Sequence, residues 1–308
     1  MDSIKLIDNN NLIQTIGLPT QDMPTQALYI VGLPIGNLAD ISLRALWILN
    51  HVDMIAAEDT RETKKILEKF NISSPLCCVH QHNEQQGAHT LIEHLQLGKR
   101  IALVTDAGTP AVSDPGAKVV RLVQEQGFRV IPIPGASAVI TAMSVAGMAP
   151  EGFIFHGFLS GGKQERRKTI KELEKTKRTF ILYEAPHRIQ KLITDLTESL
   201  EGSRRVVIAR ELTKKFESIE VQNTETLSTW IKSHKAQGEY VVIVNAQESK
   251  TQESIDDTTL EWISKLADIV PTSQLASLAS EISSHPKKAL YEQILSIKNH
   301  RSTTTLKD

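Results

Sequence analysis

Short apolar runs alternate with helical segments from residue 27 onward, and this alternation constrains the fold more than any other feature of the sequence. The runs Ala27–Leu33, Asp53–Ala57 and Ile101–Thr105 are typical of strands, and shorter runs lie at Leu76–Val79 and Arg129–Ile133. The segments between these runs carry apolar residues at helical spacing. Strands that alternate with helices favour a mainly parallel sheet covered on both faces. We therefore predict an α/β fold.

The helices of this first half are expected to begin at capping or turn residues. Asp40 is predicted to cap the helix Ile41–Asn50, and Ser113-Asp114-Pro115-Gly116 is predicted to open the helix Asp114–Gln126. The other predicted helices are residues 61–70, Gln85–Leu97 and Ala138–Ala146.

A second α/β unit is expected after Met148-Ala149-Pro150, with more antiparallel strands toward its end. Its predicted elements are the strands Phe153–Phe155, Thr179–Tyr183, Arg205–Ala209, Phe216–Val221 and Tyr240–Asn245 and the helices Gln164–Lys177, 189–200 and Leu227–Lys235. The polar segment Gln247–Asp257 is predicted to be a linker. Three short helices are predicted after it, at Leu260–Ile269, Ser273–Ile282 and Lys288–Ile297. We expect four parts: a flexible extension (1–26), two α/β domains (27–148 and 149–247) and a small helical domain (258–300), with the last seven residues as a disordered tail.

Composition limits the class of protein. The formal net charge of the 308 residues is -1, so a polyanionic partner would have to meet a local basic patch. The N-terminus lacks the pattern of a signal peptide, and no apolar run approaches the roughly 20 residues of a membrane span. The spacing of Cys77, Cys78, His80 and His82 matches no familiar zinc pattern, and we predict no metal. A cytoplasmic protein outside the membrane is expected.

Turns rich in small residues follow several of the predicted strands. Thr105-Asp106-Ala107-Gly108-Thr109-Pro110 closes one strand, and Pro134-Gly135-Ala136-Ser137 closes another. Small residues allow a ligand to approach the backbone, although close packing of a helix on the sheet also explains them. Because ligands bind at the carboxyl ends of strands in open α/β sheets, the two loops together favour a bound small molecule.

Charged clusters follow other predicted strands. Glu58-Asp59-Thr60-Arg61 could bind hydroxyl groups, or Asp59 or Thr60 could cap a helix. Tyr183-Glu184-Ala185-Pro186-His187-Arg188 carries more functional side chains than a structural turn needs. The charged run Arg210–Glu217 is either a solvated face or the lining of a cleft. The basic segment Lys163–Arg178 could hold phosphates, or its glutamates could make it an ordinary salt-bridged helix.

Taken together, these segments resemble the tetrapyrrole-methylase (class III methyltransferase) superfamily. The segments that carry the resemblance are Leu33–Asn37, Ala57–Arg61, Thr105–Pro110, Ser113–Gly116, Pro132–Ser137, Tyr183–Arg188, Arg210–Glu217 and Gly238–Tyr240. They resemble most the bacterial branch that methylates the ribose 2′-oxygen of a cytidine in the decoding region of 16S ribosomal RNA. The first loop reads Gly32-Leu33-Pro34-Ile35-Gly36-Asn37, which departs from the Gly-x-Gly-x-Gly-Asp pattern of the tetrapyrrole enzymes and suits the RNA branch.

The resemblance implies S-adenosylmethionine bound in a cleft between two α/β domains, usually in a homodimer. The residues that it implies for the cofactor are Pro34, Asp106, Ala107, Gly108, Thr109, Pro110, Ser113, Ser137, Ala138 and Tyr183. The residues expected around the reacting groups are Glu58, Arg61, Glu184, His187, Arg210, Glu211 and Lys214, with the general base left open.

The expected partner is 16S ribosomal RNA, within the small ribosomal subunit. The residues expected to hold it are Lys163, Arg166, Arg167, Lys168 and Arg188. Two alternatives stay open on the residues alone: methylation of a tetrapyrrole, and a noncatalytic RNA-binding assembly factor.

Overall fold

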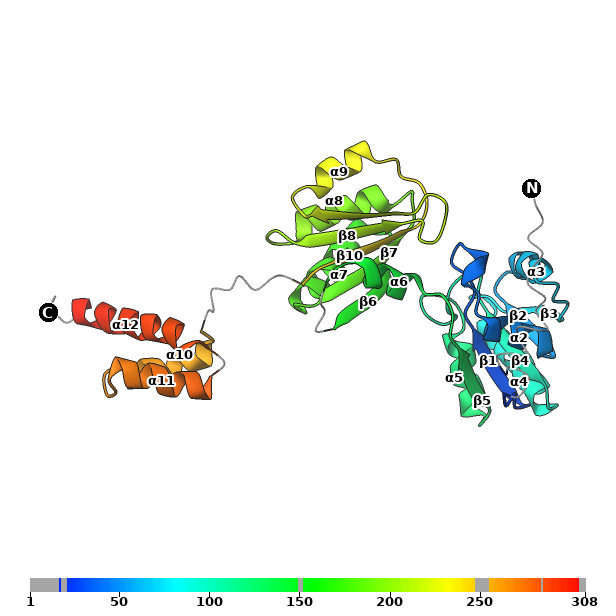
Figure 1. The fold of residues 1–308 in the computed structure, drawn as a ribbon, viewed down its shortest axis with the longest axis horizontal. Coiled ribbons are helices and arrows are strands. Elements are labelled where there is room, and N and C mark those ends of the chain that lie inside the picture. The colour runs from blue at the N-terminus through cyan, green and yellow to red at the C-terminus, as the bar shows by residue number, and fades with distance from the viewer. Residues whose placement is uncertain (1–16, 18–20, 149–151, 247–254, 284, 305–308) are drawn as a thin grey trace. The chain divides into compact units, whose positions relative to one another are not determined.

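The computed structural model describes residues 17, 21–148, 152–246, 255–283 and 285–304, and the first half of the chain contains a parallel sheet (Figure 1). The strand order of this five-stranded sheet is β3-β2-β4-β1-β5, and every pair is parallel. Its strands are β1 (Ala27–Val31), β2 (Met54–Ala57), β3 (Leu76–Cys78), β4 (Arg100–Val104) and β5 (Arg129–Ile133). Because β1 and β4 are neighbours, their carboxyl ends present the loops at Leu33 and Thr105 side by side.

Helices cover both faces of this sheet, as the alternating pattern predicts. Leu49 and Leu67 pack with Tyr29 on one face, and Leu91 and Val123 pack with Leu28 on the other. The helical elements are η2 (Leu38–Asp40), α2 (Leu43–His51), α3 (Thr60–Lys69), α4 (Glu84–Gln96), α5 (Ala117–Glu125) and α6 (Ala138–Val145). The α/β prediction for this half is confirmed.

Two of the predicted helix starts are wrong. Ser42, not Asp40, caps α2, because its hydroxyl accepts the Ala45 N–H at 3.0 Å. Helix α5 begins at Ala117 instead of Asp114, since Ser113 and Gly116 have φ values of 64° and 128°, outside the helical region.

The second half contains a mixed five-stranded sheet of order β6-β7-β10-β8-β9. Strands β6 and β7 are parallel, whereas β10 runs antiparallel to β7 and β8, and β8 runs antiparallel to β9, so the expectation of antiparallel strands is confirmed. The strands are β6 (Phe153–Phe158), β7 (Thr179–Glu184), β8 (Arg205–Arg210), β9 (Ser218–Asn223) and β10 (Tyr240–Val244).

Different helices pack on the two faces of this second sheet. Residues of α6 such as Val139 and Ala142 pack against Ile181 and Val207 on one face. Leu173, Leu196 and Trp230 belong to the core on the other face. The helices that carry them are α7 (Lys163–Lys175), α8 (Ile189–Ser199) and α9 (Leu227–Ser233).

The chain divides into two compact units, Met1–Gln247 and Glu248–Asp308. The second unit is a set of three helices around Ile263, Leu275, Leu290 and Ile294. They are α10 (Asp257–Leu266), α11 (Thr272–Ile282) and α12 (Lys287–Thr304). Helix α12 reaches Thr304, so the expected tail of seven disordered residues is wrong for residues 302–304, and residues 305–308 lie outside the described part.

Most of the expected N-terminal extension and of the expected linker also lies outside the described residues. Within the described part of the chain, none of the helices has the length and apolar character that a membrane span requires.

Candidate active site

Residues from both sheets of the first unit line one pocket of about 430 Å³, a size that suits a small-molecule ligand. The first half contributes Ile35, Glu58, Asp106, Ala107, Gly108, Thr109, Val112, Ser113, Asp114, Ser137 and Ala138. The second half contributes Phe158, Tyr183, Glu184, Ala185, Pro186, Leu212, Lys214, Glu239, Tyr240 and Val241. The pocket therefore lies where the loops after β1, β2, β4 and β5 meet the ends of β6, β7 and β10.

The loop after β4 is fixed against the loop after β1 by backbone hydrogen bonds. The Leu33 N–H donates to the Gly108 carbonyl at 2.8 Å, and the Gly108 N–H donates to the Leu33 carbonyl at 3.0 Å. Gly108 has a φ of 72°, a backbone conformation that glycine adopts without strain. The Thr109 hydroxyl donates to the Ala136 carbonyl at 3.2 Å, which joins this loop to the one after β5. The small residues therefore form a fixed wall.

Close packing, the alternative weighed for the loop after β5, applies to Gly135. A Cβ at Gly135 would lie 2.7 Å from the Gly32 carbonyl oxygen, so the two backbones approach too closely for any side chain. Ser137 and Ala138, which follow in the same loop, line the pocket instead. The loop therefore serves both roles with different residues.

Carboxylates crowd one wall of the pocket. The Asp59 N–H donates to the Asp106 carboxylate at 3.1 Å, which joins the loop after β2 to the loop after β4. Glu58 and Asp106 have raised pKa values because the pocket wall partly removes water from them and because the carboxylates repel one another. Desolvation, with repulsion from Glu58 and Asp106, raises the pKa of Asp114 to about 6, although its side chain keeps contact with solvent.

The second half contributes a half-buried tyrosine and a buried glutamate at the end of β7. Desolvation raises the pKa of Tyr183 to about 12, so its phenol stays protonated at neutral pH. Glu184 is buried, and its carboxylate accepts the Ala185 N–H at 3.0 Å and lies 3.2 Å from the Arg188 guanidinium. Burial raises the pKa of Glu184.

Lys214 places an ammonium group beside the pocket, and two glycines leave room for Lys214 and for its partner Glu211. Its Nζ donates to Glu211 and Glu239, each at 2.9 Å. A Cβ at Gly36 would lie 2.4 Å from Lys214 Cγ, and a Cβ at Gly238 would lie 2.3 Å from Glu211 Cγ. Although partial burial opposes it, hydrogen bonding to the two carboxylates raises the pKa of Lys214. The ammonium therefore stays charged and serves as a donor, not as a base.

Several residues expected at the site lie outside the lining of the pocket. Arg61 pairs with Asp59 at 2.7 Å and is largely exposed, and Asp59 caps α3, so the capping alternative holds for Asp59. Arg210 donates to the backbone carbonyls of Phe216 and Gln237, and His187 is exposed. The remaining expected residues outside the lining are Pro34, Pro110 and Glu211.

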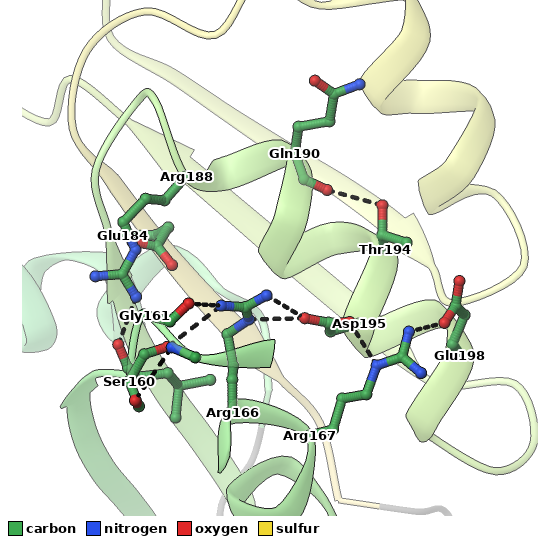
Figure 2. A network of polar contacts seen from close by, with 12 residues as sticks. Ser160, Gly161, Arg166, Arg167, Glu184, Arg188, Gln190, Thr194, Asp195 and Glu198 are labelled. Carbon is green, nitrogen blue, oxygen red and sulfur yellow. Dashed lines mark hydrogen bonds and ion pairs between the residues drawn. The ribbon is translucent and has the colours of Figure 1, made fainter. Parts of the chain in front are cut away.

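The basic helix α7 carries both buried and exposed cations, and Figure 2 shows the contacts of Arg166 and Arg167. Arg166 is buried and pairs with Asp195, and its guanidinium also donates to the carbonyls of Ser160 and Gly161. Arg167 pairs with Asp195 and with Glu198. This pairing gives both arginines a structural role, and their contact with RNA stays a prediction.

Lys163 and Lys168 are exposed, as that expectation requires. A shallow groove beside them is lined by Arg167, Lys168, Lys171, Glu172, Lys175, Glu198 and Ser199.

The lining also contains residues that the sequence analysis did not assign to the site. Asp114 was assigned to a helix start, although the turn Ser113–Gly116 directly after the small-residue loop could have indicated a pocket residue. Ile35, Val112, Leu212 and Val241 carry no signal in the sequence that separates them from core residues. Phe158 lies beyond the predicted end of its strand. Among the described residues, no group of three or more His, Cys, Asp or Glu side chains could hold a metal ion.

Comparison with known proteins places this chain in a family. The family model for tetrapyrrole (corrin/porphyrin) methylases matches residues 27–228. The chain is 45% identical over 267 residues to "Ribosomal RNA small subunit methyltransferase I" of Vibrio cholerae, covering 86% of this chain and 93% of that protein. It is 42% identical over 235 residues to the protein of the same name from Bacillus subtilis, covering 76% and 79%.

Solved structures share the fold at low sequence identity. Diphthine synthase aligns with a TM-score of 0.56 at 18% identity, over 71% of this chain and 90% of that one. Cobalt precorrin-4 methyltransferase aligns with a TM-score of 0.54 at 18% identity, over 71% and 95%. With these matches and the two-sheet architecture, the chain belongs to the tetrapyrrole (corrin/porphyrin) methylase family, whose members use S-adenosylmethionine as methyl donor.

Proposed function

We propose that this protein transfers a methyl group from S-adenosylmethionine to the ribose 2′-hydroxyl of a cytidine in 16S ribosomal RNA. The observation that carries the proposal is the carboxylate-rich pocket of small loops at the strand ends, in a chain 40–45% identical to small-subunit ribosomal RNA methyltransferases. The tetrapyrrole enzymes share only the fold with this chain at this level of identity, so the RNA substrate is favoured over a tetrapyrrole.

The lining of the pocket fits the methyl donor. Glu58, Asp106, Asp114, Glu184 and Glu239 supply carboxylates, and Lys214 supplies an ammonium group. An excess of carboxylates favours a ligand that carries a sulfonium and an amino group. The Lys214 ammonium can pair with the carboxylate of such a ligand, and the backbone of Ala107–Thr109 allows close approach. The residues expected for the cofactor that line the pocket are Asp106, Ala107, Gly108, Thr109, Ser113, Ser137, Ala138 and Tyr183.

When bound, S-adenosylmethionine supplies an activated methyl group: the ribose oxygen bonds to the methyl carbon, the carbon–sulfur bond breaks with its electrons left on sulfur, and one proton is released. The task of the protein is then to orient the hydroxyl and to accept that proton. We assign this role to Asp114, because it lines the pocket with an exposed side chain and a group with a pKa of about 6 is ionised at neutral pH and still basic. Lys214, held charged by Glu211 and Glu239, orients the methyl donor by donating hydrogen bonds to its carboxylate.

The exposed lysines of α7 are the proposed contacts to the RNA backbone. Lys163, Lys168, Lys171 and Lys175 are exposed on one helix, and three of them line a shallow groove. Because the net charge of the chain is -1, such a local patch is the way that this protein can attract a polyanion. In this proposal, Arg188 fixes the loop beside Glu184 by its ion pair with that carboxylate.

A homodimer in the cytoplasm also belongs to the proposal. Ile140 and Val145 on α6 are exposed apolar side chains, and so are Ile219 and Val221 on the edge strand β9. Light scattering on the purified protein measures the oligomeric state, and a monomer at micromolar concentration contradicts a stable dimer.

The test of the proposed function is methylation of RNA with a labelled donor. Small ribosomal subunits and free 16S RNA from cells that lack this protein are incubated with the protein and labelled S-adenosylmethionine, and the modified nucleotide is mapped. The expected product is a 2′-O-methylcytidine at one position. Label in a tetrapyrrole, or RNA binding with no incorporation, overturns the proposal in favour of one of the two alternatives.

A further inference from the structure

Phe158 is a large apolar side chain left exposed at the pocket. It lines the pocket at the end of β6, and 52% of its surface is accessible to solvent. An exposed aromatic ring in a ligand pocket is a candidate contact for a flat ligand. The mechanism derived above gives this ring no role.

The strand β6 turns Phe158 toward the pocket through an irregularity in its pairing. The register between β6 and β7 shifts between Phe155 and Gly157. Phe155 pairs with Ile181, and beyond the shift Gly157 pairs with Leu182 and Phe158 with Tyr183. Gly157 has a φ of 79°, and a Cβ there would lie 2.4 Å from the Ser113 hydroxyl oxygen. The Phe158 ring contacts Tyr183 edge to face, with centroids 5.6 Å apart. An edge-to-face contact occupies at most one face of a ring, which leaves stacking surface on Phe158.

The segment directly after Phe158 is held by the buried Arg166 and the half-buried Arg188 (Figure 2). The Arg188 guanidinium donates to the Leu159 carbonyl, and the Arg166 guanidinium donates to Ser160 and Gly161 at 3.3 and 3.0 Å. Asp195 holds Arg166 in place, and Leu159 is itself buried. The ring is therefore presented by a fixed strand end, which lowers the entropy lost when a ligand stacks on it.

The position of Phe158 in the chain points to an RNA base and not to the cofactor. The segment that follows it leads through Gly161-Gly162 into α7, which carries the exposed lysines proposed for RNA. The small-residue loops that fit the cofactor come instead from the ends of β1, β4 and β5. Proteins that recognise single RNA bases commonly stack them on aromatic side chains.

We propose that the Phe158 ring stacks on the base of the target nucleotide and thereby positions its ribose in the pocket. This inference rests on the proposed function, because it assigns a residue to recognition of that same substrate. The shared chemistry is a flat nucleobase, and the adenine of S-adenosylmethionine is the other source that the experiment must separate.

The experiment compares the full-length protein with Phe158→Ala, Phe158→Leu and Phe158→Tyr. Two quantities are measured for each: kcat/KM for methylation of RNA, and Kd for S-adenosylmethionine by calorimetry. For Phe158→Ala, kcat/KM should fall about tenfold or more, while Kd for the cofactor stays within about twofold. Phe158→Tyr should stay near the wild type, and Phe158→Leu, which keeps apolar bulk without the ring, should resemble Phe158→Ala.

A second readout does not depend on turnover. A short RNA with a fluorescent cytidine analogue at the target position should lose fluorescence on binding the wild type, because stacking quenches it, and should keep its fluorescence with Phe158→Ala. Leu97→Ala is the control, since Leu97 is 74% exposed at the end of α4 and lies outside the described pocket lining. It should match the wild type in every measurement.

The outcomes separate this inference from the proposed function. A wild type that does not methylate RNA removes the proposed function and the inference with it. A wild type that methylates RNA, with Phe158→Ala equally active and equally quenching, overturns the inference alone. A selective loss of cofactor affinity in Phe158→Ala assigns the ring to adenine and also overturns it.

Discussion

At the scale of single residues, the environment of Asp114 determines how the site responds to pH. The wall of the pocket and the neighbours Glu58 and Asp106 raise the pKa of Asp114 to about 6. A carboxylate accepts a proton only when it is ionised, so the methylation rate should rise about tenfold per pH unit below pH 6 and level off above it. The measurement is kcat against pH between 5 and 8 with RNA at saturation.

Asp114→Asn removes this proton acceptor with little change in shape. Its kcat at pH 7.5 should fall about a hundredfold, and the limb near pH 6 should disappear. A raised pKa in the folded state means that ionisation of Asp114 opposes folding, and this cost grows as the pH rises from the ordinary value to about 6 and is constant above it. Asp114→Asn should therefore unfold at a urea concentration no lower than the wild type at pH 7.5. If Asp114→Asn stays active, or if its kcat still rises with pH near pH 6, Asp114 is not the proton acceptor. Glu93→Gln, at an exposed position on α4, is the control.

At the scale of elements, the buried cluster between α7 and α8 separates structural cations from those that could hold RNA. The side chains of Arg166 and Asp195 are 4% and 2% exposed. Removal of Arg166 takes away one of the two partners of the buried Asp195 carboxylate, so Arg166→Met should lower the free energy of unfolding by about 3 kcal/mol. Arg166→Met/Asp195→Leu should cost less than the sum of the two single changes, measured by urea denaturation. If the double change costs as much as the two single changes together, the coupling between Arg166 and Asp195 is contradicted.

Changes at the exposed lysines of α7 should affect RNA binding and leave stability almost unchanged. Lys168→Ala and Lys171→Ala should leave the free energy of unfolding within about 0.5 kcal/mol of the wild type. Each should weaken RNA binding and lower the slope of log K against log salt concentration by about 1. Lys64→Ala, at an exposed position on α3, is the matched control. An unchanged salt slope for both variants removes α7 from the RNA contact.

The same helices show how far the sequence can predict the structure. The strands and the small-residue loops are predictable because apolar runs and Gly-rich turns are local signals, and Asp106–Thr109 indeed lie in the pocket. Arg166 and Lys168 look alike in sequence, and only the position of Asp195, 29 residues beyond Arg166, makes one of them structural. The place of Phe158 could not be predicted for a similar reason, since a shift in strand register directs it to the pocket. Contacts between distant segments decide these cases.

At the scale of the whole molecule, the pocket belongs to one of the two compact units. The described residues that line it lie between Ile35 and Val241, and the first unit ends at Gln247. The helices after Gln247 have their own core, built on residues such as Ile263 and Leu290. A ligand that binds only the folded form of one unit stabilises that unit by mass action.

S-adenosylmethionine should therefore raise the unfolding temperature of the first unit selectively. At a concentration of about 100 Kd, the gain is about 2.7 kcal/mol, which corresponds to roughly 5–10 °C for a unit of this size. The measurement is differential scanning calorimetry of the full chain with and without the donor. A chain that ends at Gln247 identifies the transition of the first unit and should bind the donor within about twofold of the full chain. If that shorter chain folds but loses its affinity, the helices after Gln247 contribute to the donor site, and the pocket as defined by the first unit is incomplete.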